Sequence, residues 1–350
     1  GLAILVLQVP IKAAGFALLS AAPEVKAAGQ AFFNASIWGA PATLLNYVLI
    51  GWYLGRSQSG KVFLLSAIVN LSNVGLAYLF IVRWGWESAG AGAATALSRT
   101  LMAVIGIGLA CREIDIAQVR RLSGQILNPK ALKKSVALNS ELMVRTFAMI
   151  SVFAAFTNIG STLGATVLSS NAVLLQAIAL ASYFIDGLAF ATESVVGTLS
   201  AQGRMRSLIQ LLKAAGSTSF LLGLMFALIF IAAPGPIFQL LTNHRDVLSH
   251  IDTYTPWLLP VLGFGSIAYF LDGYFIGLTE GRLLRVSALA AASIGFAPVA
   301  LVAWYLHNNH VLWLGLALFM AIRAITLGIQ VPKTLQKASG IQGQPLKAWE

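Results

Sequence analysis

Two carboxylates stand inside one long apolar stretch of the chain. Asp186 and Glu193 belong to the segment S-Y-F-I-D-G-L-A-F-A-T-E-S-V-V-G-T-L-S-A-Q, which runs from Ser182 to Gln202. They are two helical turns apart, so both side chains leave the same face of a helix, and Tyr183 shares that face. An ionisable group at bilayer depth costs at least ~2.5 kcal/mol on insertion scales, so it normally faces a bundle interior or a watery cavity. The pattern favours a helix that lines a transport chamber.

Other polar residues extend this candidate site. Asp272 precedes Gly273 near the end of another apolar run. We interpret Asp272 as a group that contacts the ion or substrate, or as the mark of a gate or hinge. Asn171 and Gln176 are weaker candidates for lining the cavity, because they lie on the same helix as Asp186 and because hydrogen bonding between helices is the default explanation for such amides.

A second pair of charges has the spacing of a structural contact. Glu141 and Arg145 are separated by four residues at the start of an apolar span. This spacing places two side chains side by side on a helix, so we predict a structural ion pair. For Asp186, in contrast, a purely structural role would require a buried partner such as Arg145.

The composition indicates a membrane protein. Hydrophobic residues make up 58% of the 350 residues and charged residues 10%, against roughly 25% charged residues in soluble domains. The apolar residues come in blocks long enough to cross a bilayer as helices. We predict an all-α, polytopic helical membrane protein. Its ten expected spans lie near residues 1–20, 31–54, 62–82, 88–111, 139–160, 172–199, 208–233, 254–278, 284–306 and 311–331.

The distribution of the basic residues explains the net charge of +11. Alternate loops and the tail hold Arg56, Lys61, Arg112, Arg120, Arg121, Lys130, Lys133, Lys134, Arg204, Arg206, Lys213, Arg282, Arg285, Lys333, Lys337 and Lys347. The loops of the opposite side hold only Lys12, Lys26, Arg83 and Arg245. Such an asymmetry over short loops is the positive-inside pattern. We therefore expect the first set and the C-terminus to be cytosolic, and we discount nucleic acid as a partner.

An internal repeat organises the chain. The stretch G-W-Y-L-G from Gly51 reads like G-Y-F-I-G from Gly273, and later spans keep the same offset. The spans near 139 and 172 have no counterpart, so we expect about two further helices upstream, although a native ten-span protein is an alternative. The expected domains are an N-terminal lobe remnant at 1–111, a cytosolic basic linker at 112–138, a C-terminal six-helix lobe at 139–331 and a cytosolic tail at 332–350.

Five stretches in order resemble a known family. They are S-I-W-G-A-P-A-T-L-L-N-Y-V-L-I-G-W-Y-L-G from Ser36, N-L-S-N from Asn70, N-S-E-L-M-V-R-T from Asn139, I-D-G-L-A-F-A-T-E from Ile185 and Y-F-L-D-G-Y-F-I-G from Tyr269. The chain resembles the DinF-like branch of the multidrug and toxic compound extrusion (MATE) family. The resemblance implies a cation-coupled efflux antiporter with two pseudo-symmetric six-helix lobes around a central cleft, the N-terminal lobe being incomplete here.

The chain departs from the family pattern at two places. The family's first helix usually carries an aspartate used in cation coupling, and that helix lies outside this chain. The family often reads N-x-x-N-x-x-L-D in the third span, whereas here Asn70, Asn73 and Leu76 are followed by Ala77. Coupling therefore rests either on the missing helix or on the C-terminal lobe.

The function that we predict from the sequence is secondary active transport, in which H⁺ or Na⁺ is exchanged for organic, cationic or amphiphilic compounds. An ion that neutralises Asp186 would remove the attraction of the cavity for a cationic guest. One alternative is a lipid-linked sugar flippase of the same superfamily, although the spans offer few basic groups for a pyrophosphate. Another is an intramembrane enzyme, but no D-D-x-x-D, H-E-x-x-H, P-loop or nucleotide-binding glycine pattern occurs.

The same reasoning limits cofactors and partners. We assign no catalytic residue and no metal site, since Cys111 is the single cysteine and the four histidines are scattered. We expect no cofactor besides the coupling H⁺ or Na⁺. The expected partners are small organic substrates and the lipid bilayer, and the expected state is a monomer in the cell membrane.

Overall fold

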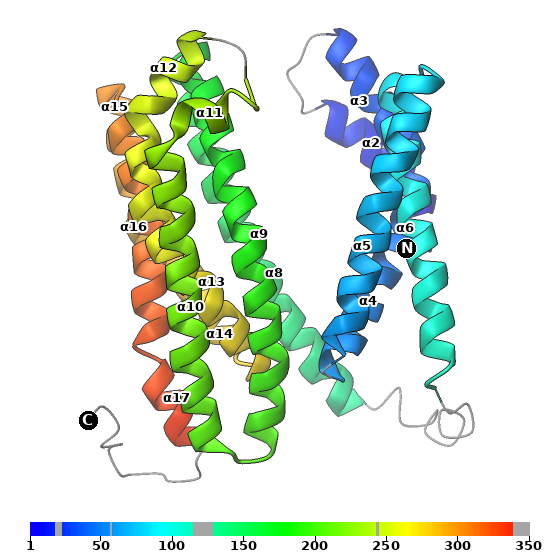
Figure 1. Ribbon diagram of the computed structural model, residues 1–350, viewed down its shortest axis with the longest axis vertical. Helices are drawn as coiled ribbons and strands as arrows, with labels where there is room; N and C mark the ends of the chain where they lie inside the picture. The colour runs from blue at the N-terminus through cyan, green and yellow to red at the C-terminus, as the bar shows by residue number, and fades with distance from the viewer. Residues whose placement is uncertain (18–22, 57, 115–128, 243–244, 339–350) are drawn as a thin grey trace. The chain divides into compact units, whose positions relative to one another are not determined.

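The fold is described by a computed structural model, which covers the chain except residues 18–22, 57, 115–128, 243–244 and 339–350. All regular structure in the described residues is helical (Figure 1). Eight of the described helical segments are long and apolar enough to cross a membrane. They are Ser59–Arg83, Glu87–Cys111, Ser135–Thr162, Ala165–Ala201, Met205–Ala232, Arg245–Gly277, Gly281–Leu306 and Asn309–Gln336. The prediction of an all-α, multi-pass membrane protein is confirmed.

The chain divides into two compact units, residues 1–126 and 127–350. The first unit consists of α1 (Leu2–Val6), α2 (Gln8–Ala17), α3 (Pro23–Ser36), the 3-10 turn η1 (Ile37–Gly39), α4 (Ala40–Gly55), α5 (Ser59–Ala77), the π-helical turn η2 (Tyr78–Arg83) and α6 (Glu87–Cys111). Its small core packs α4, α5 and α6 together around Tyr53 and Leu65. Two of the eight membrane-length segments belong to this unit.

The first two predicted spans contain local irregularities. The span near 1–20 has a turn at Leu7 between α1 and α2, and the span near 31–54 is helical throughout but includes the 3-10 turn η1. α1 ends at Val6, four residues before Pro10, and η1 begins at Ile37, four residues before Pro41. A proline lacks the N–H for a helical hydrogen bond, and its ring clashes with the carbonyl of the fourth residue before it. Neither segment is among the eight membrane-length segments of the described residues, so these two spans stay predictions.

The second unit contains the other six membrane-length segments. It consists of α8 (Pro129–Thr162), α9 (Ala165–Ala201), α10 (Met205–Ala232), α11 (Pro234–Phe238), α12 (Arg245–Tyr254), η4 (Thr255–Trp257), α13 (Leu258–Gly277), α14 (Gly281–Ala290), η5 (Ala291–Phe296), α15 (Ala297–Leu306), α16 (Asn309–Gly328) and α17 (Val331–Ala338). Residues 115–128 of the predicted linker and 339–350 of the predicted tail lie outside the described residues. α8 and α17 extend into the described parts of these two segments.

The predicted internal repeat reappears in the helix boundaries. α4 ends at Gly55 and α13 at Gly277, while α5 begins at Ser59 and α14 at Gly281. Each pair differs by 222 residues, and the starts of α6 and α16 are separated by the same interval. The positions of the helix ends therefore repeat with the same offset as the sequence motifs.

α13 is the central helix of the second unit, where it packs against α9, α10 and α16. Its contact with α9 depends on two glycines one helical turn apart. A Cβ on Gly273 would lie 2.4 Å from the carbonyl oxygen of Ala189, and a Cβ on Gly277 would lie 2.6 Å from that of Glu193. Small residues with this spacing let two membrane helices approach backbone to backbone. This approach brings Asp272 of α13 close to α9.

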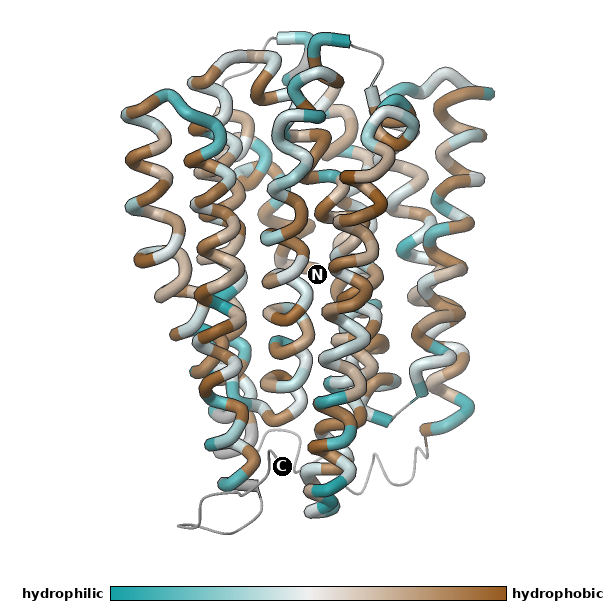
Figure 2. The backbone as a smooth tube through the Cα atoms, turned by 60° about the vertical axis from the view of Figure 1, so that its left-hand side comes forward, coloured by the Kyte–Doolittle hydropathy of each residue, from teal (hydrophilic) through white to brown (hydrophobic). Residues whose placement is uncertain are grey.

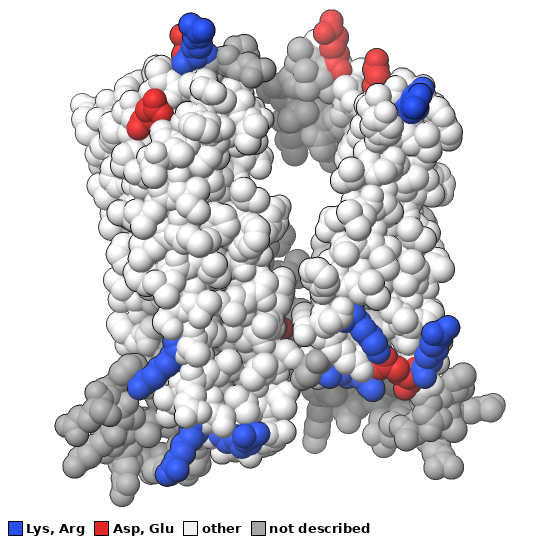
Figure 3. All heavy atoms as spheres, in the orientation of Figure 1, with Lys and Arg blue, Asp and Glu red and all other residues white. Residues whose placement is uncertain are grey.

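The surface of each unit fits a membrane setting. Hydrophobic residues continue along the lengths of the helices (Figure 2). Most of the charged side chains visible on each unit lie toward its two ends, and the sides are uncharged except for a small acidic patch on the second unit (Figure 3). This distribution matches a hydrocarbon zone between two polar interfaces.

Candidate functional site

Asp272 of α13 is held by arginines from two other helices. The residue is 4% exposed. Its Oδ2 accepts hydrogen bonds from Nη2 of Arg145 on α8 and from Nη2 of Arg323 on α16, the latter at 2.5 Å. Both contacts are ion pairs. Since removing one partner of a buried pair leaves an uncompensated charge, this arrangement ties the three helices together.

Arg323 is the most deeply buried charge of this group. It is 1% exposed, and its guanidinium carbon lies 5.6 Å from the ring centroid of Tyr269 and 5.7 Å from that of Phe319. Aromatic faces at this distance stabilise a desolvated cation. Nη1 of Arg323 and Nε of Arg145 are buried without a hydrogen-bond partner among the described residues. The two arginines therefore keep donors that Asp272 does not use.

Asp186 lies beside this arrangement but is not locked into it. It is half-buried on α9 and forms no hydrogen bond or ion pair with another described side chain. The charged groups that act on it electrostatically are Asp272, Arg145 and Arg323. We call these four residues the acid–arginine cluster. With both carboxylates ionised the cluster is neutral, and Asp186 is its one carboxylate without a direct ion pair in the described structure.

Tyr269 connects α9 to the cluster. Its hydroxyl faces Ser182, one helical turn before Asp186. Its ring lies beside the guanidinium of Arg323. The same tyrosine therefore lies between the buried cation and the part of α9 that carries Asp186.

The other predicted cavity residues on α9 lie away from the cluster. Glu193 is half-buried, and no charged group of the cluster acts on it. Tyr183 is 74% exposed and Gln176 is exposed within the second unit. The structure thus places Asp186 and Asp272 together and leaves these three residues on their own.

Asn171 belongs to a buried hydrogen-bond network between α9 and α16. The residue is 1% exposed. Its Nδ2 donates to Oδ1 of Asn309 at 2.8 Å, and its Oδ1 accepts from Nδ2 of Asn309 and from Nε1 of Trp313, each at 3.0 Å. These contacts agree with the interhelical hydrogen bonding that is the default explanation for such amides, and a role of Asn171 in a cavity stays a prediction.

The predicted pair of Glu141 with Arg145 is replaced by two other pairs. Oε2 of Glu141 lies 2.8 Å from Nε of Arg285, and Arg145 binds Asp272 instead. The spacing of four residues permits the local contact. However, the Asp272 side chain is 6% exposed and that of Glu141 is 23% exposed. A carboxylate that is less hydrated attracts a guanidinium more strongly.

Sequence reasoning missed the joint role of Arg145 and Arg323. Arg323 lies in the middle of an apolar span, and a charged residue at such a place is itself a signal of function. Among the described residues no group of three or more His, Cys, Asp or Glu side chains could hold a metal ion. The two guanidinium groups and two carboxylates of the cluster can form ion pairs, and a carboxylate can change its charge.

Comparisons with known proteins identify the family. The MatE family model matches residues 142–302. The chain is 30% identical over 332 residues to the DNA damage-inducible protein F of Escherichia coli (strain K12), covering 93% of this chain and 71% of that protein. It is 24% identical to the protein DETOXIFICATION 44, chloroplastic, of Arabidopsis thaliana, of which it spans 56%.

Solved structures share the fold. A structure described as MATE in complex with MaL6 matches with a TM-score of 0.86 and 16% identity, over 97% of this chain and 77% of that one. A MOP superfamily transporter from Pyrococcus furiosus matches with a TM-score of 0.86 and 15% identity, over 96% of this chain and 76% of that one. The chain therefore belongs to the multidrug and toxic compound extrusion family, in its DinF-like branch, and is a membrane transporter and not an enzyme.

Proposed function

We propose that the protein is a secondary active efflux transporter that exchanges H⁺ or Na⁺ for organic cations or amphiphiles. The observation that carries this proposal is the position of Asp186. It is a half-buried carboxylate within a membrane-spanning helix, and it forms no ion pair with a described residue beside a buried Arg–Asp–Arg group. A membrane protein retains such a costly group where it meets an ion or a substrate.

The charge balance of the cluster supports a mechanism. With Asp186 ionised, the cluster is neutral and a cationic guest meets one carboxylate without a competing guanidinium bond. When H⁺ or Na⁺ neutralises Asp186, the cluster carries one net positive charge and repels the cation. The ion and the guest thus weaken each other's binding, and by linkage this coupling is reciprocal. An inward ion gradient would then drive the guest outward.

The test replaces Asp186 by Asn, which keeps the shape and removes the charge. We expect gradient-driven efflux of a cationic dye to be lost in cells and in proteoliposomes, while the amount of folded protein is unchanged. Asp252→Asn is the matched control, because Asp252 is exposed on α12, outside the cluster. Efflux by the Asp186→Asn variant at the wild-type rate would overturn the assignment. Imposing a proton gradient or a sodium gradient alone separates the two coupling ions.

A second candidate function is the flipping of a lipid-linked sugar pyrophosphate. The observation that favours it is the pair of arginines, each with a buried nitrogen that has no partner among the described residues. Guanidinium groups bind phosphate oxygens well. The test measures transbilayer movement of a fluorescent lipid pyrophosphate in proteoliposomes. Movement that is lost in Arg323→Met and is not changed by adding the cationic dye would favour this function over drug efflux.

The proposed location is the cell membrane with a cytosolic C-terminus. It is supported by the excess of Lys and Arg in the alternate loops and the tail, since this excess marks the cytosolic side of membrane proteins. Accessibility of a cysteine introduced at Lys333 to a membrane-impermeant thiol reagent tests it, in a background where Cys111 is replaced by Ser. Labelling only after the cells are opened is the expected result.

A further inference from the structure

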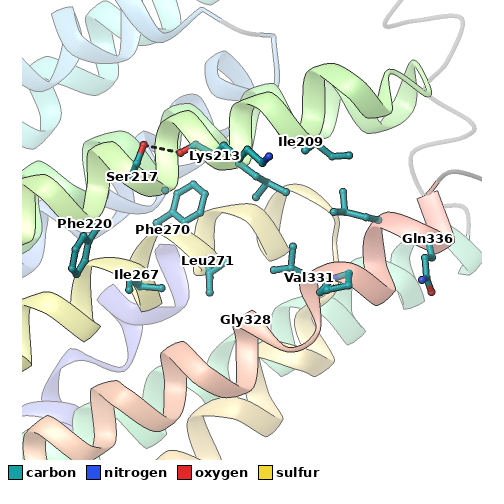
Figure 4. A pocket seen from close by; sticks show the side chains of 14 residues that line it. Ile209, Lys213, Ser217, Phe220, Ile267, Phe270, Leu271, Gly328, Val331 and Gln336 are labelled. Carbon is teal, nitrogen blue, oxygen red and sulfur yellow. Dashed lines mark hydrogen bonds between the residues drawn. The ribbon is translucent and has the colours of Figure 1, made fainter. Parts of the chain in front are cut away.

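An apolar groove lies on the second unit, apart from the acid–arginine cluster. Its volume is about 550 Å³, within the range of roughly 300–1,000 Å³ that small-molecule sites have. α13 contributes its floor with Ile267, Phe270 and Leu271, and α10 contributes one wall (Figure 4). The end of α16 and the start of α17 form the other wall, where Gly328 and Val331 lie.

The groove is held in shape by contacts around it. The hydroxyl of Tyr274 on α13 lies 3.0 Å from that of Thr334 on α17, which fixes α17 against the unit. Gly216 faces the ring of Phe270 across the contact of α10 with α13. The hydroxyl of Ser217 donates to the backbone carbonyl of Lys213. The side chains along the groove consequently offer mostly apolar surface.

The two helices that wall the groove carry several basic residues. Lys213 is exposed and lines it. Arg204 and Arg206 are exposed where α10 begins, and Lys333 is exposed on α17. Neither α10 nor α17 contains an aspartate or a glutamate. An apolar groove between membrane helices with a basic end on the expected cytosolic side has the composition of a site for an anionic lipid.

We propose that this groove binds one anionic phospholipid of the cytosolic leaflet. An acyl chain lies on Ile267, Phe270 and Leu271, and the phosphate lies at Lys213. The apolar contact supplies most of the affinity, because each buried methylene contributes about 0.8 kcal/mol. The lysine supplies the preference for an anionic over a zwitterionic lipid. The site is separate from the proposed transport cluster and does not depend on what the protein transports.

The first experiment fills the groove from opposite walls. A Cβ on Gly328 meets no atom within 4 Å, so Gly328→Leu places a side chain in open space, and Ser217→Phe adds bulk on α10. Binding of palmitoyl-oleoyl phosphatidylglycerol to the purified protein is titrated by native mass spectrometry. Each variant is expected to weaken the tightest lipid site about tenfold, the effect of displacing two methylenes at ~0.8 kcal/mol each. Gly108→Leu is the control, because a Cβ there also meets no atom within 4 Å.

The second experiment tests the headgroup. Lys213→Gln is expected to weaken phosphatidylglycerol binding about fivefold, as one basic side chain near anionic lipid contributes ~1 kcal/mol, and to leave phosphatidylcholine binding unchanged. Lys133→Gln, an exposed lysine on α8, is the control. Unchanged phosphatidylglycerol affinity in both filled variants would overturn the proposal, and so would equal binding of the two lipids by the wild type. The thermal unfolding temperature of each variant is measured as a control, and a value equal to that of the wild type shows that the variant is folded.

Discussion

The strongest quantitative test of the structure is the replacement of Asp272 by Asn. The change keeps the size of the side chain and removes the charge that pairs with both Arg145 and Arg323. Arg323 is 1% exposed and cannot reach water from its position. The variant therefore holds a buried guanidinium without an ion-pair partner, and Asp186 is the remaining carboxylate of the cluster.

The magnitude follows from the burial of the three partners. Breaking a buried ion pair by removing one partner costs about 3–5 kcal/mol. The Arg145 side chain is 17% exposed, so it can turn toward solvent and adds little to the cost. We expect Asp272→Asn to lower the free energy of unfolding by about 3–5 kcal/mol. Asp186→Asn, which breaks no ion pair with a described residue, is expected to change it by less than about 1 kcal/mol.

The assay is denaturant unfolding of the purified protein in mixed micelles, combined with a double variant. Asp272→Asn with Arg323→Met removes the stranded charge, and replacing a whole buried pair by apolar groups is often close to neutral. We expect the double variant to be more stable than Asp272→Asn alone by at least about 1 kcal/mol, which is within the range of coupling for residues in contact. Strictly additive losses, or a loss below about 1 kcal/mol in Asp272→Asn, would refute the reasoning.

Two further predictions concern the packing of α9. Gly273→Ala places a Cβ 2.4 Å from the carbonyl oxygen of Ala189 and should cost about 1–3 kcal/mol of stability through overpacking. The control is Gly187→Ala, where a Cβ meets no atom within 4 Å; in the same unfolding assay its stability should equal or exceed that of the wild type. Asn171→Leu leaves the indole N–H of Trp313 without its acceptor, so we expect a loss of about 1–3 kcal/mol with dye efflux per folded molecule unchanged.

The general architecture could be predicted from local patterns. Apolar blocks, the asymmetry of basic residues and the repeat at Gly51 and Gly273 depend only on residues near each other in sequence or at a fixed offset. The turn before Pro10 and the 3-10 turn before Pro41 are also readable in principle, because a proline disturbs the carbonyl of the fourth residue before it. The length of an apolar block does not register such a local change of the backbone.

The pairing of charges could not be predicted in the same way. The spacing of Glu141 and Arg145 shows only that a contact within the helix is possible. The partner of Arg145 depends on which side chains of other helices lie next to α8. That partner, Asp272, is brought to its position by the close contact of α13 with α9 and α16. The partners of Asn171 could not be predicted either, because its position on the same helix as Asp186 does not indicate that Trp313 of α16 packs against it.

The two carboxylates of the cluster differ in the cost of losing their charge, and this difference assigns their roles. Neutralising Asp272 breaks two ion pairs, one of them with a guanidinium that is fully buried. Neutralising Asp186 breaks no ion pair with a described residue. A penalty of about 3–5 kcal/mol corresponds to a factor of roughly 10² to 10³ or more in the equilibrium for binding an ion. Under the proposed exchange, an incoming H⁺ or Na⁺ is therefore expected to neutralise Asp186, while Asp272 holds α8, α13 and α16 together.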